Sequence, residues 1–268
     1  MTLQELYGKI GLQQEIAEKL NGLQPGFSFP EELIERMMDM DAAEGAYREL
    51  DALLTEDGDH LKMLLCQMEC ARRTYGQYQA KGISDEIFVE TMKCFTRFMD
   101  ECGRMHGRLF FDRGWWTYRQ ISMSLFRIGA LEYEFRVQEG EQVLSLHIPS
   151  DADLSPESVD RSLAQAEDFF RIYYPAYAYS RYICDSWLLS PKLKELLPEG
   201  SRILAFQERF RLLSADPEAP GFIQWIFQTP SDTEVRTLPE RTSLQRRTKA
   251  LLLSGGSIGA AYGEIRRA

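Results

Sequence analysis

The chain has 268 residues, of which 44% are hydrophobic, and a formal net charge of −10. The acidic charge argues against broad nucleic-acid binding, and no apolar run approaches the roughly twenty residues that a membrane-spanning helix needs. Because the N-terminal stretch carries charges throughout and lacks a secretory apolar core, we expect a cytoplasmic protein that binds neither nucleic acid nor membrane.

Residues 1–106 are predicted to be helical throughout. One helix is expected over 12–20, a second from Pro30 to 54, and a third from 61 to Gly82. Apolar residues recur in them at helical spacing, and Ser84 is a suitable N-cap for a fourth helix that reaches 105. Short connections between these helices favour antiparallel neighbours, and hence a helical bundle.

From Gly107 aromatic residues crowd together and strand-like alternation begins. Leu131 to Arg136 alternate apolar and charged side chains, as in a half-buried strand. Val143 to Ile148 form a second, apolar strand that Pro149 ends. The turn sequence at 138–141 joins the two strands into a hairpin.

A helix is expected to begin soon after this hairpin. Ser155 stands at the N-cap, Pro156 at the first helical position, and Glu157 in the first turn, where a negative charge is favourable. A strand that feeds a helix N-terminus presents backbone N–H groups to the intervening loop, so this start could bind an anion. It could equally be a capped crossover helix that binds nothing.

The remaining elements complete a mixed sheet. Strands are predicted at 179–188, 210–213 and 222–227, helices at 191–197 and 242–253, and the small-residue tail from Gly259 could be a last strand. The strand that follows the crossover helix should run parallel to the strand before it. The fold class is therefore α+β with an α/β-type mixed sheet. It places a helical N-terminal domain over 1–106 and a second domain over 107–268.

The five cysteines show no metal-binding spacing. Cys66 and Cys70 lie one helical turn apart, but no histidine or acidic cluster completes a ligand set, so we expect core packing and no metal. In a chain with no export signal, reduced thiols are expected.

The C-terminal segment is basic within an acidic chain. From Val235 to the end, seven Lys and Arg residues, among them Arg246, Arg247 and Arg267, stand against two Glu residues. Such a segment could meet a phosphate-bearing ligand, or it could be a solvated helix face.

Candidate catalytic residues are expected at the ends of the two parallel strands. A sheet that changes from antiparallel to parallel pairing has a crevice there, between the loop from Ile148 to Ser155 and the strand end that carries Asp185. His147 enters this crevice, and Asp185 could act as a base or as a hydrogen-bonding group. A lone strand histidine could equally be structural.

The hairpin register pairs His147 with a carboxylate. A two-residue loop at Glu139-Gly140, or a four-residue loop at 138–141, makes Glu132 face His147 directly. Directly opposed residues lie on one face of the sheet, with Cβ atoms about 5 Å apart. The pair is either a polar edge of the catalytic site or a cross-strand ion pair that fixes the register.

A family resemblance is carried by three stretches, HIPSDADLSPESVDRSLAQAEDFF, CDSWLLSP and LPEGSRILAFQERF. They are similar to the C-terminal domain of a bacterial two-domain family in the GNAT acyltransferase superfamily, whose N-terminal half is helical. The resemblance covers most of the chain. It implies a GNAT-like fold and transfer of an acyl group from acyl-CoA or acetyl-CoA to a small-molecule amine. It also implies that the pantetheine lies where two parallel strands splay, and that the pyrophosphate caps the following helix.

The loop before this helix departs from the superfamily's phosphate-binding pattern, Gln/Arg-x-x-Gly-x-Gly/Ala. Residues 149–156 contain no glycine and carry Asp151 and Asp153, which would repel a pyrophosphate. Backbone N–H groups and Arg161 could offset the repulsion, or the chain could have lost CoA binding. The expected CoA ligands are Ile148, Ser150, Ser155, Glu157, Arg161, Arg246 and Arg247, and the expected catalytic residues are His147, Glu132 and Asp185.

The resulting hypothesis is an acyl-CoA-dependent N-acyltransferase with an unidentified amine acceptor. The alternative is a non-catalytic GNAT-like module that binds a small molecule or a protein. The altered loop favours the alternative, and the basic C-terminal segment favours the enzyme.

Overall fold

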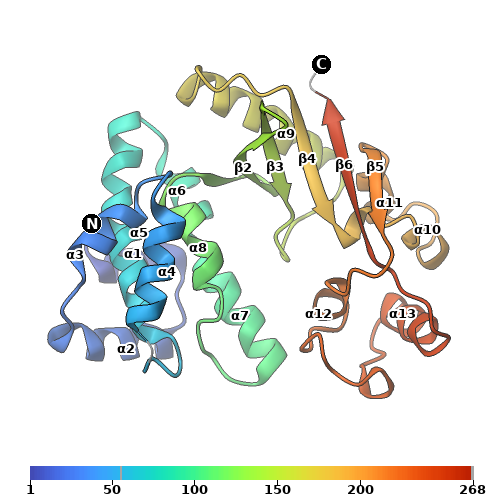
Figure 1. Cartoon of the computed structure of the whole chain (residues 1–268), viewed down its shortest axis with the longest axis horizontal. Helices are drawn as coiled ribbons and strands as arrows, with labels where there is room; N and C mark the ends of the chain where they lie inside the picture. The colour runs from blue at the N-terminus through green and yellow to red at the C-terminus, as the bar shows by residue number, and fades with distance from the viewer. Residues whose placement is uncertain (55, 267–268) are drawn as a thin grey trace. The chain divides into compact units, whose positions relative to one another are not determined.

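The computed structural model describes residues 1–54 and 56–266. It divides into two compact units, Met1–Ile128 and Gly129–Ala268, the first helical and the second built around a sheet (Figure 1). This architecture confirms the predicted α+β class. Among the described helices, none has both the length and the apolar character that a membrane-spanning segment needs.

Helices make up nearly all of the regular structure in the first unit. Its elements are α1 (Leu3–Ile10), α2 (Gln14–Leu23), η1 (Gln24–Gly26), α3 (Glu31–Met37), α4 (Ala43–Leu53), α5 (Leu61–Lys81), α6 (Asp85–Met92), α7 (Cys94–His106), α8 (Gly114–Ile121) and the short strand β1 (Leu125–Ile128). The helical prediction for residues 1–106 is confirmed, with differences in where single helices begin and end.

Two of the expected helices are interrupted. The second splits into α3 and α4, because the Asp39 carboxylate accepts the backbone N–H groups of Asp41 and Ala42, at 2.9 and 3.2 Å, and stabilises a turn. The helix expected after Ser84 splits into α6 and α7 at Lys93. The apolar residues keep their helical spacing across both breaks, because a short turn need not change the position of the apolar face. The sequence pattern therefore did not reveal the breaks.

Local end signals are confirmed at α5 and α6. Gly82 ends α5 in the left-handed conformation, at φ +72°, and Ser84 accepts the N–H of Ile87 at 3.4 Å. The helical prediction for 1–106 gave α1 no bounds of its own, although Thr2 and Glu5 form a capping box that marks its start.

The first unit extends past the domain boundary expected at residue 106. Two buried side chains of α5 bind backbone carbonyls of α8: Gln67 and Thr74 each donate a hydrogen bond of 2.9 Å. These contacts hold α8 within the helical unit, and the compact units divide after Ile128.

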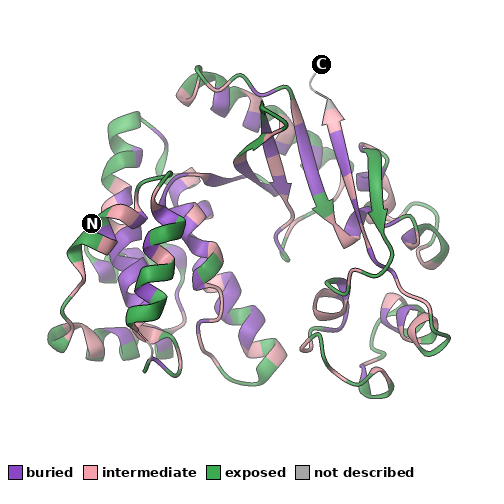
Figure 2. Ribbon diagram, in the orientation of Figure 1, coloured by how far each residue is buried: buried purple, intermediate pink, exposed green. Residues whose placement is uncertain are grey.

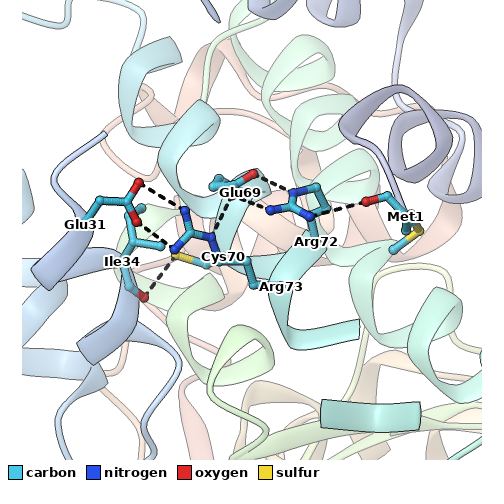
Figure 3. Close-up of polar contacts among 7 residues, drawn as sticks. All are labelled: Met1, Glu31, Ile34, Glu69, Cys70, Arg72 and Arg73. Atoms are coloured by element: carbon cyan, nitrogen blue, oxygen red, sulfur yellow. Dashed lines mark hydrogen bonds and ion pairs between the residues drawn. The ribbon is translucent and has the colours of Figure 1, made fainter. Parts of the chain in front are cut away.

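Glu69 on α5 centres an ion network that joins three parts of the first unit (Figure 3). Its carboxylate pairs with Arg72 at 2.6 Å and with Arg73 at 2.7 Å. Arg73 also pairs with Glu31 of α3 at 2.7 Å, and Arg72 donates to the Met1 carbonyl at 3.4 Å. Burial disfavours the ionised Glu69, yet the hydrogen bonds from the two arginines lower its pKa.

The cysteines pack in the interior. All five are free and buried, Cys66 and Cys70 within α5. Cys70 donates a weak hydrogen bond from Sγ to the Ile34 carbonyl at 3.6 Å (Figure 3). Core packing of the Cys66 and Cys70 pair is confirmed.

The second unit alternates strands with helices. Its elements are β2 (Leu131–Gln138), β3 (Glu141–His147), α9 (Pro156–Tyr173), β4 (Arg181–Ser186), η2 (Trp187–Leu189), α10 (Leu193–Leu196), α11 (Arg202–Gln207), β5 (Arg211–Asp216), α12 (Phe222–Phe227), η3 (Val235–Thr237), α13 (Ser243–Leu253) and β6 (Ala260–Arg266). The strands lie side by side in the order β2-β3-β4-β6-β5. Only β3 and β4 pair in parallel among these described strands, as the crossover through α9 predicts. The edge strand β5 is exposed along its length, whereas the middle of β4, from Tyr182 to Cys184, is buried (Figure 2).

The hairpin has the predicted register. Val137 pairs with Gln142, and Glu132 with His147. The two-residue loop at Glu139-Gly140 has φ values of +53° and +81°, as the primed turns favoured in tight hairpins require.

The strand predicted at 222–227 is wrong, because this segment forms α12. Phe222, Ile226 and Phe227 lie on one face of the helix and are buried in a small core with Leu193, Leu238 and Ile258. Five of the six residues are aromatic or β-branched, and Gln224 is the exception, so the segment resembles a buried strand. Only the neighbouring helices provide the surface that makes the helical face favourable.

Candidate functional site

The parallel pair of strands loses its ladder before the strands end. Leu144 pairs with Tyr182 and Ser145 with Ile183, whereas β3 continues to His147 and β4 to Ser186. The ends of these two strands therefore have backbone groups that do not pair with each other among the described residues. This is where the sequence predicts a bound ligand.

His147, at the end of β3, binds a carboxylate other than the one predicted. Its Nε2 lies 2.8 Å from Oε2 of Glu134, and the imidazole is 22% exposed. Glu132 faces His147 directly across the hairpin, as predicted, but the hydrogen bond goes to Glu134, two residues further along β2 on the same face. Diagonal neighbours lie within reach of long side chains, so the register alone does not choose between the two carboxylates.

The Glu134 carboxylate is held in a fixed position. It is only 6% exposed, and the same oxygen that meets His147 lies 3.2 Å from Nε of Arg136. Because an ionised carboxylate only accepts hydrogen bonds, His147 Nε2 is the donor. In a neutral imidazole Nδ1 is then the basic nitrogen.

Asp185 and Tyr262 oppose each other on β4 and β6. Partial loss of hydration and the nearby Asp216 carboxylate raise the pKa of Asp185 above its usual value. Asp185 is exposed, so it is accessible to a ligand at the strand end. Tyr262 donates a short hydrogen bond to the side chain of Gln138 on β2.

The start of α9 already holds an internal carboxylate. Ser155 occupies the predicted N-cap position, but its side chain does not cap the helix: its N–H and Oγ both donate to Asp153, at 3.0 and 2.8 Å. The N–H of Ser158 donates to the Ser155 carbonyl, and Pro156 has no N–H. The predicted anion site at this helix start therefore rests on the N–H of Glu157.

Two arginines that the sequence did not single out lie near this helix start. Arg202 of α11 pairs with Asp153 at 3.0 Å. Arg209 donates to the Pro156 carbonyl at 3.1 Å and forms an ion pair with Asp160. Hydrogen bonds from Ser155, together with Arg202 and Arg161, lower the pKa of Asp153 and favour its ionised form. No local signal marks these arginines, because they are distant in sequence and meet α9 only in the fold.

The other predicted CoA ligands lie in different surroundings. Ile148 is half-buried after β3, and Ser150, Glu157 and Arg161 are exposed. Arg246 and Arg247 are exposed on α13 and donate to the carbonyls of Glu240 and Leu196, at 3.0 and 2.7 Å. Arg267 of the basic segment lies outside the described residues.

A hollow of about 560 Å³ lies in the first unit, lined by Met1, Glu5, Gly8, Lys9 and Tyr75. None of these is a predicted site residue. The hollow therefore provides no evidence for a ligand site at the end of β3. The assignment of that site depends on the strand pairing and on the His147–Glu134 contact.

Family models match nearly the whole chain. Residues 125–265 match the GNAT-like C-terminal domain, and residues 1–123 match the N-acyltransferase N-terminal domain. The chain therefore belongs to the GNAT-like family and has the two-domain organisation that the resemblance implied.

Solved structures of acyltransferases have the same fold. One, a variant in complex with octanoyl-CoA, is 21% identical, with 99% of this chain and 87% of that chain covered and a TM-score of 0.84. Another, in complex with decanoyl-CoA and teicoplanin, is 22% identical over 99% of both chains with a TM-score of 0.74. A third, with decanoyl-CoA, is 20% identical over 100% of both chains with a TM-score of 0.75. None of the curated proteins matches this chain.

Proposed function

We propose that this chain is an acyl-CoA-dependent N-acyltransferase that transfers a medium-chain acyl group to the amine of a small molecule. The observation that carries the proposal is the hydrogen bond from His147 to the buried Glu134, at the end of β3 in a GNAT-like domain. The complexes of similar structures with octanoyl-CoA and decanoyl-CoA support a medium-chain donor, and the teicoplanin complex supports a small-molecule acceptor.

His147 has the chemistry of a general base for this reaction. Nδ1 accepts a proton from the attacking amine, while Glu134 fixes the ring and stabilises the imidazolium that forms. The amine nitrogen bonds to the thioester carbonyl carbon, the carbon–sulfur bond breaks, and CoA leaves as a thiolate that takes up the proton. Asp185 is the alternative base, and Glu132 is assigned to the polar edge beside His147.

The donor is assigned to the ends of β3 and β4. The pantetheine would lie beside Ile148, Ser150 and Ser155, where the two strands no longer pair. Arg161, Arg202 and the N–H of Glu157 supply positive potential for the pyrophosphate near the start of α9. Arg246 and Arg247 are the alternative phosphate ligands.

Thermal unfolding with decanoyl-CoA tests the binding step. A ligand at a hundred times its dissociation constant stabilises the folded state by about 2.7 kcal/mol. The transfer step is measured as release of the CoA thiol with a panel of primary amines, with His147→Ala as the control. No stabilisation at saturating decanoyl-CoA would overturn the proposal.

A non-catalytic binding module is the second candidate, and the Asp153 carboxylate at the start of α9 favours it. In that case a ligand would still stabilise the protein, but thiol release by the wild-type chain would not exceed that of His147→Ala. The two measurements together separate the candidates.

A further inference from the structure

The side chains of Cys102, His106 and Asp112, in the first unit, bring three potential metal-binding atoms together. Their ligand atoms, the Cys102 sulfur, a ring nitrogen of His106 and an Asp112 carboxylate oxygen, all lie within 4.8 Å of one another. Cys102 is buried, Asp112 is half-buried and His106 is exposed. The group thus extends from the interior to the surface.

The backbone brings these residues together in two ways. Cys102 and His106 are four residues apart on α7, so their side chains lie on the same helical face. Gly107 then ends α7 in the left-handed conformation, at φ +70°, and turns the chain back toward the helix. A Cβ on Gly103 would lie 2.9 Å from Leu109 Cδ2, which shows how closely the returning loop packs on α7.

The arginines near this group are already paired with carboxylates, so their charge does not exclude a bound cation. Of the two neighbouring arginines, Arg113 lies 3.1 Å from Glu101 and 3.7 Å from Asp112 Oδ1, whereas Arg108 pairs with Asp59 at 2.6 Å. Asp112 Oδ1 is buried and accepts no hydrogen bond from any residue that the structure describes. A buried carboxylate oxygen without a hydrogen bond is costly, and a bound cation would satisfy it.

We propose that Cys102, His106 and Asp112 bind one late first-row divalent cation, with Zn²⁺ as the physiological candidate and water as the fourth ligand. Thiolate, imidazole and carboxylate are the ligands that Zn²⁺ uses in proteins, and three protein ligands with one open position form a familiar tetrahedral arrangement. Metal–ligand bonds of about 2.0 to 2.3 Å require the three atoms to draw slightly closer, which the exposed His106 side chain can do by rotation. This site is independent of the proposed acyl transfer.

Binding forms a sulfur–metal bond and breaks the sulfur–hydrogen bond of Cys102, whose proton goes to solvent. Cys102 otherwise donates that hydrogen weakly to the Arg108 carbonyl, at 3.8 Å. Metal uptake should therefore release a proton and weaken as the pH falls.

The test is a titration of the full-length chain with Co²⁺, a spectroscopic substitute for Zn²⁺. We expect one equivalent to bind, with a thiolate-to-cobalt charge-transfer band and tetrahedral visible bands, and Zn²⁺ should displace it. His106→Ala should weaken binding by about tenfold or more, and Cys102→Ala should abolish the charge-transfer band. Cys94→Ala, a buried cysteine on the same helix, is the matched control and should bind as the wild type does.

Failure to fold does not obscure the result, because His106 is exposed and its replacement leaves the core unchanged. Absence of the charge-transfer band in the folded wild-type chain overturns the proposal. So does equal Co²⁺ affinity of the wild type and His106→Ala. Loss of the band in Cys94→Ala but not in Cys102→Ala would also overturn it.

Discussion

His147 Nε2 lies 2.8 Å from the carboxylate of Glu134, although Glu132 is the residue that faces it across the hairpin. The contact makes Glu134 the carboxylate that the proposed mechanism places beside the imidazole. Glu134 is buried beside Arg136 and can hold the ring in one orientation, so the proposed role of His147 depends on it.

Replacement of His147 by Ala should lower the turnover number by a factor of about 10² to 10⁴, the usual contribution of a general base. Glu134→Gln should lower it by about tenfold or more, because a neutral amide stabilises the imidazolium less. Glu132→Gln is the control and should lower the turnover number less than Glu134→Gln does. Steady-state kinetics with decanoyl-CoA give the result, and the melting temperatures must stay close to the wild-type value. A larger loss of turnover in Glu132→Gln than in Glu134→Gln would show that Glu132, which faces His147 directly, is the carboxylate that supports the imidazole.

Charge reversal of Arg202 should weaken binding of decanoyl-CoA by about tenfold and reduce its dependence on salt. Removing the opposing charge with Asp153→Asn should strengthen binding, since Asp153 repels a phosphate while its amide replacement still accepts the Ser155 N–H. Isothermal titration at two salt concentrations gives both quantities.

The double variant Arg246→Glu, Arg247→Glu tests the alternative phosphate site on α13. We expect its affinity for decanoyl-CoA to stay close to that of the wild type, because both arginines already bind backbone carbonyls within the second unit. A loss of affinity in this double variant, with Arg202→Glu unchanged, would place the phosphates at the basic C-terminal segment.

Glu69→Gln should destabilise the first unit by about 2 kcal/mol, because it leaves Arg72 and Arg73 without their buried counter-charge. The folded pKa of Glu69 lies below its usual value of about 4.5, so ionised Glu69 stabilises the fold above that pH. This stabilisation is lost as the pH falls through the folded pKa. Urea denaturation of both proteins should thus show a constant difference in unfolding free energy above pH 4.5 that shrinks at lower pH. Glu15→Gln, in the exposed pair with Lys19, should change stability by less than about 0.5 kcal/mol.

Two glycines near the C-terminus provide a matched test of backbone packing. Gly255 and Gly259 both have positive φ, +84° and +70°, but a Cβ on Gly255 would meet nothing within 4 Å, whereas one on Gly259 would lie 2.3 Å from the Asp216 carbonyl oxygen. Gly255→Ala should cost about 1 kcal/mol from conformation alone. Gly259→Ala should cost about 3 kcal/mol or more, since backbone atoms must move. Equal melting temperatures for the two variants would contradict this account of the β5–β6 contact.

Several features of this protein follow from its sequence because their causes are local. The apolar stripe of α5 and the left-handed Gly82 that ends it depend on residues within one or two turns. The register that places Glu132 opposite His147 depends on the two-residue turn at Glu139-Gly140, and α9 begins at Pro156 for reasons of backbone geometry.

Tertiary structure decides the features whose partners lie far apart in the chain. The choice of Glu134 over Glu132 depends on how a side chain leans across the sheet, which the register does not determine. Arg202 reaches Asp153 only because α11 folds back to α9, and residues 222–227 are helical only because other segments cover one face. Hydrophobic burial and ion pairing act through space and not along the chain, so the positions of these side chains are set by the fold as a whole.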